Sequence, residues 1–225
     1  MINLNKFEII KECYDMGLDY VTEDSSLFFY SLVKMKKPEK ILELGTGNGA
    51  TAFLIALALS ENNKGTITTI DNASAWKGDN TLSDHIEKYK IKWNLQNYLN
   101  FKLEDINLNN ISYMKNVDIV TSDFLRTPEF VGTLIYWWLL NSNTYSSLFI
   151  DGLSDFYPGF SFVTDTFKFF NKNIVPTNFP KNTKEYINYK FTQLNIRKTE
   201  NEKLQNGITW IKKEPHTIGI QKLKG

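Results

Sequence analysis

Residues 40–51 read KILELGTGNGAT, and this stretch decides the fold. Residues 40–44 form a short apolar run with one acid, Glu43, and the run stops abruptly at a glycine-rich turn. A short apolar run that ends in this way is typical of a buried parallel strand. Apolar residues resume at Ala50 and continue to residue 60, which predicts a helix. We therefore expect a strand, a tight glycine turn and a helix in direct succession.

The alternation of strands and helices continues on both sides of this stretch. Apolar residues at helical spacing predict helices at residues 4–19, 25–35, 50–60, 83–97, 127–140 and 158–170. Short apolar or β-branched runs predict strands at residues 40–44, 66–70, 100–103, 117–121, 147–150, 189–196 and 208–223. Such alternation indicates an α/β fold with a mostly parallel sheet. The last two runs, separated by a polar stretch, predict an antiparallel pair at one edge of the sheet.

The length and composition favour a single domain. At 225 residues the chain can bury a sizeable core, and we find no repeat or linker in it. We expect an N-terminal helical segment, residues 1–37, followed by the α/β core, residues 38–225. No stretch approaches the ~20 apolar residues of a membrane span. Cys13 is the only cysteine and the N-terminus lacks the layout of a secretory signal, so we expect a cytoplasmic protein.

The charge balance bears on the class of substrate. The formal net charge is +1, and the basic residues are scattered among acidic ones. No global field attracts nucleic acid or an anionic membrane. A small-molecule or protein substrate is favoured.

The glycine turn has the properties of a ligand cradle. Gly45 and Gly47 lack a Cβ atom, so the backbone can turn tightly and approach a ligand closely. The start of the next helix offers N–H groups to a carboxylate or a phosphate. Asp71 ends the following strand, where an acid can accept the two hydroxyls of a ribose. These features together indicate an adenosine-type ligand.

Two cofactors satisfy this pattern. Gly45, Gly47 and Ala50 match the dinucleotide motif, in which a pyrophosphate lies on the helix N-terminus. Glu43 favours S-adenosylmethionine, because an anion there repels a pyrophosphate but can meet the ammonium of a methionine group. A third interpretation is a glycine turn that serves only the packing of the helix on the strand.

On these residues the sequence resembles the class I S-adenosylmethionine-dependent methyltransferases, in their small-molecule O-methyltransferase-like branch. The resemblance spans about residues 20–170, and its motifs are DYVT at 19–22, KILELGTGNGAT at 40–51, ITTID at 67–71, VDIVTSD at 117–123 and LFIDG at 148–152. It implies a Rossmann-like three-layer sandwich. The implied sheet has seven mostly parallel strands with an antiparallel last strand, and helices are added at the N-terminus.

The resemblance also implies a set of cofactor contacts. Glu43, Gly45 and Gly47 would line the methionine end. Asp71 would bind the ribose hydroxyls, and Asp105 would face the adenine amino group. Asp123 would contact the methionine ammonium, and in this branch the corresponding acid sometimes holds a divalent metal. The expected cofactor-binding residues are Glu43, Gly45, Thr46, Gly47, Asp71, Asn72, Asp105 and Asp123.

The catalytic residues follow from the chemistry of the acceptor. Methyl transfer needs alignment of nucleophile, methyl carbon and sulfur, and a hydroxyl acceptor must also lose its proton. We expect Asp123, Asp151 and His216 to be the catalytic residues, with His216 favoured over His85 as a base. Asp123 and Asp151 are also the candidate Mg²⁺ ligands.

Two departures from the metal-dependent members weigh against the metal. Gly152 follows Asp151 where those enzymes usually carry a further ligand. Arg126 stands where they often carry a lysine near the substrate hydroxyl, and an arginine stays protonated at neutral pH.

We expect a small hydroxylated acceptor and a homodimer. The alternatives are methylation of protein or RNA, and a non-catalytic scaffold that keeps the cofactor fold. Trp76 follows Asp71 in a polar loop, and we expect it to shield the adenine.

Overall fold

The structure is a computed structural model that describes residues 6–15, 23–111, 114–153, 158–177, 179–180, 189–197 and 207–215. The chain divides into two compact units, Met1–Leu125 and Arg126–Gly225. Across the described residues, no helix is both long and apolar enough to span a membrane.

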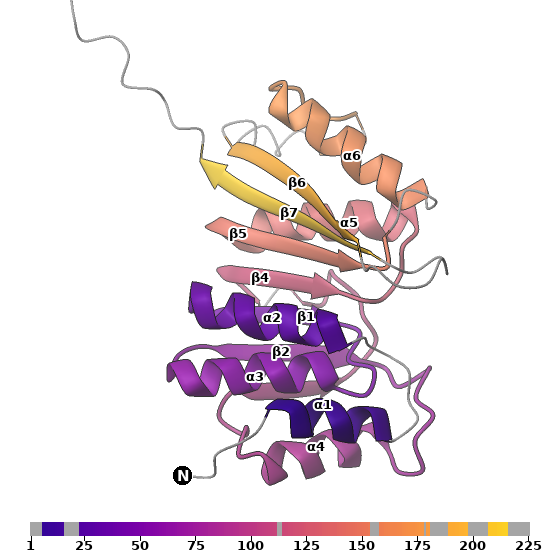
Figure 1. Ribbon diagram of the computed structural model, residues 1–225. Helices are drawn as coiled ribbons and strands as arrows, with labels where there is room; N and C mark the ends of the chain where they lie inside the picture. The colour runs from indigo at the N-terminus through magenta and orange to yellow at the C-terminus, as the bar shows by residue number, and fades with distance from the viewer. Residues whose placement is uncertain are drawn as a thin grey trace, which may run out of the picture. The chain divides into compact units, whose positions relative to one another are not determined.

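The first unit contains a parallel sheet with helices packed on it (Figure 1). Its helices are α1 (Lys6–Asp15), α2 (Glu23–Lys36), α3 (Ala50–Asn62) and α4 (Leu82–Lys92). Its strands are β1 (Lys40–Leu44), β2 (Thr66–Asp71), β3 (Leu99–Leu103) and β4 (Val117–Ser122). Strand β1 pairs with β2 and β4, and β2 pairs with β3, all in parallel. The carboxyl ends of these strands therefore lie along one edge of the sheet.

Burial explains why this unit folds around β1 and α3. Ile41, Leu42 and Leu44 of β1 are fully buried. Helix α3 is apolar on all sides, and its residues from Ala52 to Leu59 are at most 2% exposed. It tolerates this composition because α1 and α2 pack against it in addition to the sheet. The glycine loop, residues 45–49, is thereby fixed between a buried strand and a buried helix.

The second unit contains an antiparallel group of strands and two helices. Its elements are α5 (Pro128–Asn141), β5 (Ser142–Asp151), α6 (Pro158–Asn171), β6 (Tyr189–Arg197) and β7 (Gly207–Pro215). Strand β7 lies between β5 and β6 and runs antiparallel to both. An aromatic cluster forms the core, in which Phe191 contacts Trp138, Phe167 and Phe170 at centroid distances of 4.9 to 6.3 Å.

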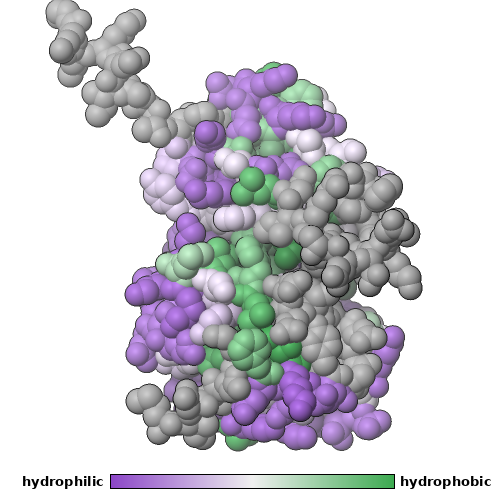
Figure 2. All heavy atoms as spheres, in the orientation of Figure 1, coloured by the Kyte–Doolittle hydropathy of each residue, from purple (hydrophilic) through white to green (hydrophobic). Residues whose placement is uncertain are grey.

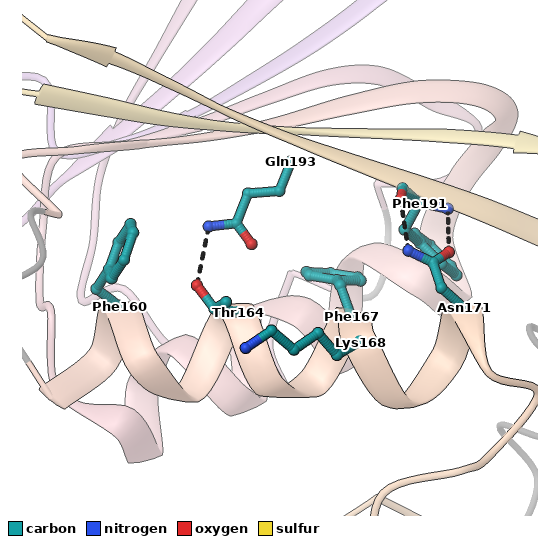
Figure 3. A pocket seen from close by; sticks show the side chains of 7 residues that line it. All are labelled: Phe160, Thr164, Phe167, Lys168, Asn171, Phe191 and Gln193. Atoms are coloured by element: carbon teal, nitrogen blue, oxygen red, sulfur yellow. Dashed lines mark hydrogen bonds between the residues drawn. The ribbon is translucent and has the colours of Figure 1, made fainter.

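Helix α6 covers part of strand β6 (Figure 3). Asn171 donates Nδ2–H to the carbonyl of Phe191 at 2.7 Å and accepts the Phe191 N–H at 2.8 Å. One side chain thus pairs with the strand backbone as a neighbouring strand would. A cavity of about 320 Å³ lies beside this contact. Its polar side chains are used within the protein, since Gln193 donates to the Thr164 hydroxyl at 3.1 Å.

The surface carries mixed charge. Figure 2 shows hydrophilic residues over much of the drawn face, with a strip of apolar residues over the helices of the first unit. Lysines alternate with acids, as in the pairs Lys34–Glu61 and Lys64–Glu39, both at 3.1 Å. This surface agrees with the balanced charge of the sequence.

The predicted fold class is confirmed. In the described residues the strands form one seven-stranded sheet in the order β3-β2-β1-β4-β5-β7-β6, with the antiparallel pair that the sequence predicts. The single-domain boundaries stay a prediction.

Two element boundaries within the described residues differ from expectation by five residues. Helix α4 ends at Lys92 and not at residue 97, because Asn94 adopts the left-handed conformation (φ 54°). Strand β5 begins at Ser142 and not at residue 147, because the chain becomes extended directly after α5 (Ser142 φ −100°, ψ 156°), and its pairing with β7 starts at Ser146. The end of the last predicted strand, residues 216–223, lies outside the described residues.

Candidate cofactor site

The candidate site lies at the carboxyl edge of the parallel strands in the first unit. Glu43 is near the end of β1, Asp71 ends β2, and Asp123 directly follows β4. In open α/β sheets, ligands bind at this edge. The glycine loop connects β1 to α3, and β1 lies between the strands that carry the other two acids, β2 and β4.

Gly45 allows the loop to lie close against the end of β4. Its φ is +91°, and a Cβ atom there would lie 2.4 Å from the Asp123 carbonyl oxygen. The Gly45 N–H donates to the carbonyl of Ile70 at 2.9 Å, and the Asp123 N–H donates to the carbonyl of Leu44 at 2.9 Å. The loop is therefore held to both neighbouring strands, and no other residue type fits at position 45 without moving backbone.

The carboxylate of Asp71 turns back onto the glycine loop. Its Oδ2 accepts the N–H groups of Thr46 at 2.8 Å and Gly47 at 3.2 Å. Its Oδ1 accepts the Ala73 N–H at 2.7 Å. A carboxylate has about four acceptor positions, so about one remains on Oδ1 for a ligand. The loop amides that a bound phosphate would use already hold an anion that belongs to the protein.

Glu43 is a buried acid at the centre of the site. Its side chain is 4% exposed, and in the sheet it lies between Thr69 of β2 and Thr121 of β4. The Thr69 hydroxyl donates to Glu43 Oε2 at 2.6 Å and lies 2.6 Å from the Thr46 hydroxyl. Because Thr69 has one proton and gives it to Glu43, Thr46 must donate to Thr69. A chain of hydrogen bonds therefore runs from the loop to the acid.

Burial raises the pKa of Glu43 to about 8. The hydrogen bond from Thr69 opposes this rise, while the negative charges of Asp123 and Asp71 add to it. Glu43 is mostly protonated at pH 7 when no ligand is present. The sequence interpretation, in which Glu43 repels a pyrophosphate as an anion, therefore needs correction, because the standing negative charge beside the loop amides comes from Asp71. A cationic group placed near Glu43 favours its ionised form.

The structure brings two further predicted residues together. Asn72 donates Nδ2–H to Asp105 Oδ1 at 3.0 Å, although the residues are 33 positions apart. The Asn72 side-chain oxygen also accepts the Ser74 N–H at 3.0 Å. Both side chains are exposed, and they follow the paired ends of β2 and β3. They form an exposed polar pair at the same edge as Asp71.

Trp76 and His85 lie beside the glycine loop. The two rings are 4.7 Å apart between centroids, and the Trp76 indole N–H donates to the Asn80 carbonyl at 2.6 Å. His85 is 7% exposed, and its Nε2 lies 2.9 Å from the carbonyl oxygen of Asn48. In the structure the ring of Trp76 therefore contacts His85. The expected contact of Trp76 with an adenine stays a prediction.

The predicted catalytic acids belong to different units. Asp123 lies in the first unit and Asp151 in the second, so their expected convergence stays a prediction. Asp151 Oδ1 accepts the N–H of Gly152 at 2.8 Å, and Arg126 Nε donates to the Asp151 carbonyl at 2.9 Å. His216 lies outside the described residues.

The residues around Asp151 do not fit a divalent cation. A Cβ atom on Gly152 would lie 2.5 Å from the Arg126 guanidinium, which shows how closely this permanent positive charge approaches. Within the described residues, no group of three or more His, Cys, Asp or Glu side chains could hold a metal ion. We therefore assign no chemical step to Mg²⁺.

Sequence reasoning missed Thr69 and Asn48, and it did not connect His85 with the glycine loop. Thr69 is fully buried in a strand whose neighbours are also buried. A buried hydroxyl needs a hydrogen-bond partner, so a threonine in a strand of buried residues was the signal in the sequence that could have indicated this role. Asn48 was not separable from the other loop residues by sequence alone.

Solved methyltransferases share this fold. An O-methyltransferase from Bacillus cereus in complex with SAH is 16% identical, with a TM-score of 0.59, and the match covers 94% of this chain and 92% of that one. The O-methyltransferase TomG from Streptomyces achromogenes, in complex with SAM, is 14% identical with a TM-score of 0.59, covering 95% and 92%. An rRNA methylase from Streptococcus thermophilus is 11% identical with a TM-score of 0.54, covering 84% and 94%.

The comparison by sequence finds no counterpart. No protein-family model matches the chain, and no curated protein matches it significantly. At identities of 11 to 16%, these solved structures establish the fold alone, which this chain shares with the two O-methyltransferases and the rRNA methylase.

Proposed function

We propose that this protein is an S-adenosylmethionine-dependent methyltransferase that acts on a hydroxyl group of a small molecule. The observation that carries the proposal is the carboxylate of Asp71 on the amides of Thr46 and Gly47. A dinucleotide needs such amides for its pyrophosphate, and a second anion at the same place would be repelled. S-adenosylmethionine has no phosphate, so it does not compete with Asp71. The solved relatives in fold that contain SAM or SAH support the same cofactor.

The cofactor would lie along the edge from Asp123 to Asp105. Glu43, Thr46 and the two loop glycines, Gly45 and Gly47, would line its methionine end. Glu43 and Asp123 would meet the ammonium, with Glu43 becoming ionised as the cation arrives. The remaining acceptor position of Asp71 suits one ribose hydroxyl rather than both. The Asn72–Asp105 pair would face the adenine end.

The bound cofactor would supply an electrophilic methyl group on a cationic sulfur. The protein's contribution is to align the acceptor oxygen with that group and to exclude other nucleophiles. Asp123, which is exposed at the end of β4, is the candidate in the first unit to take the hydroxyl proton. Asp151 and His216 remain proposed alternatives for the same proton.

The acceptor is proposed to be a small molecule, because the net charge is only +1 and lysines on the described surface pair with acids, as Lys34 and Lys64 do. Methylation of RNA or protein is the second candidate, and the fold shared with an rRNA methylase supports the RNA alternative. The protein is proposed to work in the reducing cytoplasm, since a chain with one cysteine forms no internal disulfide.

Calorimetry with S-adenosylmethionine, its demethylated product and NAD tests the cofactor. We expect the first two to bind and NAD not to bind. Tight binding of NAD without a response to S-adenosylmethionine would overturn the proposal.

A labelled cofactor incubated with cell extract tests the reaction. Label should appear in the small-molecule fraction, and it should persist in EDTA because the Arg126 guanidinium beside Gly152 disfavours a divalent cation at Asp151. Label confined to RNA or protein would favour the second candidate. Binding without any transfer would instead favour a scaffold.

A further inference from the structure

His85 makes a hydrogen bond to the backbone of the glycine loop. Its Nε2 lies 2.9 Å from the carbonyl oxygen of Asn48, 37 residues earlier in the chain. A carbonyl oxygen only accepts, so Nε2 must carry the proton and donate it. Asn48 is 2% exposed and lies between Gly47 and Gly49. The imidazole therefore holds the middle of the loop from the side of α4.

Helix α4 contacts the loop at a second, adjacent position. A Cβ atom on Gly49, where φ is +86°, would lie 2.7 Å from Ile86 Cδ1 and 2.7 Å from Phe53 Cε2. Two successive residues of α4, His85 and Ile86, thus contact two successive residues of the loop. The apolar contact brings the helix close, and the hydrogen bond gives the contact a direction.

The ring of His85 is itself held in place. It contacts the ring of Trp76 at 4.7 Å and the ring of Tyr89 at 5.0 Å between centroids, with the ring planes inclined at 52° and 58°. Burial lowers the pKa of His85, and the nearby charge of Lys88 lowers it further, while the bond to Asn48 opposes this. The ring is therefore neutral at pH 7, with its single proton on Nε2. A buried ring with this proton committed to a carbonyl is poorly suited to act as a base.

We propose that His85 is a positioning residue that fixes the glycine loop for the methionine end of the cofactor. Asp71 holds the loop from the sheet side through the amides of Thr46 and Gly47, and His85 holds it from the helix side through the carbonyl of Asn48. The inference rests on the proposed function, because it assigns the loop to the methionine group. It predicts that losing the imidazole donor harms binding of the methionine part more than binding of the nucleoside part.

Two substitutions separate the hydrogen bond from the packing. His85→Phe keeps an aromatic ring against Trp76 and Tyr89 but removes the donor, whereas His85→Gln keeps an N–H donor at similar reach. The ligands are S-adenosylhomocysteine, which has the amino-acid part, and adenosine, which lacks it. We expect His85→Phe to weaken S-adenosylhomocysteine binding about tenfold, as the loss of one buried hydrogen bond implies. Adenosine binding should stay within about twofold, and His85→Gln should recover most of the affinity.

Trp93→Phe is the matched control for damage to α4. Trp93 is 2% exposed and packs on Phe53 and Tyr89, so this variant loosens the helix without touching the loop bond. It should lower thermal stability and leave both affinities unchanged. Equal affinities of wild type and His85→Phe would overturn the proposal. So would an equal loss in Trp93→Phe.

Hydrogen exchange keeps the test valid if the proposed function fails. Should the wild type bind neither ligand, exchange of the amides of residues 46–50 is compared in the unliganded proteins. Faster exchange in His85→Phe, but not in His85→Gln or Trp93→Phe, would support the positioning role by itself. Identical exchange in all four proteins would overturn it.

Discussion

Glu43→Gln is expected to change how the stability of the protein depends on pH. The side chain is 4% exposed and accepts a hydrogen bond from Thr69. Burial raises its pKa from the ordinary 4.5 to about 8. Glutamine has nearly the same shape and keeps an oxygen for Thr69, but it does not titrate. The substitution therefore removes the proton equilibrium and leaves most of the packing in place.

The sign and the size follow from linkage. Between pH 4.5 and about 8 the folded protein holds a proton on Glu43 that the unfolded chain has released. The free energy of unfolding therefore falls as the pH rises through this window. The free energy of unfolding falls by about 1.4 kcal/mol for each pH unit in this window. The total decrease is about 5 kcal/mol once the pH exceeds 8, and about 3 kcal/mol of this decrease occurs between pH 5 and pH 8.

Urea unfolding at pH 5, 6, 7 and 8 measures this effect. Relative to the wild type, Glu43→Gln should gain about 3 kcal/mol of unfolding free energy from pH 5 to pH 8. Glu39→Gln is the control, because Glu39 directly precedes β1 but its side chain is 71% exposed and pairs with Lys64 at the surface. Its stability should run parallel to that of the wild type. If Glu43→Gln also runs parallel, Glu43 titrates normally and the buried neutral acid is refuted.

Three further outcomes are expected. S-adenosylhomocysteine binding at pH 6.5 should release about one proton, because the ligand ammonium favours the ionised form of Glu43. Calorimetry in buffers of different ionisation enthalpy measures this release. Binding without proton release would show that the ammonium does not lie near Glu43. Asp71→Asn should weaken binding of S-adenosylhomocysteine by about 1–3 kcal/mol, because the amide keeps a single acceptor oxygen for the loop N–H groups and places an NH2 donor where Oδ1 now accepts the Ala73 N–H and has room for a ligand hydroxyl; unchanged affinity would show that Asp71 has no part in binding. Asn171→Ala should lower the free energy of unfolding by about 1–3 kcal/mol and promote aggregation, because the N–H and the carbonyl of Phe191 lose their hydrogen bonds to the Asn171 side chain. Thermal melts and light scattering measure the two effects. A soluble variant of unchanged stability would contradict this prediction.

Local patterns were sufficient for the elements and for the place of the site. An apolar run that ends at glycines predicts the β1 strand and the loop, and both occur at the expected residues. The helix predicted from residue 127 is also present, and the Thr127 hydroxyl caps α5 by accepting the N–H of Phe130, three residues ahead. Asp71 lies at the end of β2 for the same local reason. Each of these features depends on residues within a few positions of one another.

Partners far apart in the sequence were not predictable in this way. The carboxylate of Asp71 bonds an amide 25 residues earlier, and His85 bonds a carbonyl 37 residues earlier. Both bonds depend on the angle at which an element packs on the loop. The neutral state of Glu43 also depends on distant residues, because the neighbouring strands and the loop exclude water from it.

The chain therefore encodes a strand, a glycine turn and an acid at the next strand end in patterns that can be read locally. Which groups those residues bind is decided only when the sheet assembles, because hydrogen bonds and pKa values depend on distance and solvent exclusion. Asp71 shows the difference: its position follows from the end of a strand, but its attachment to the loop amides follows from the parallel pairing of β1 with β2.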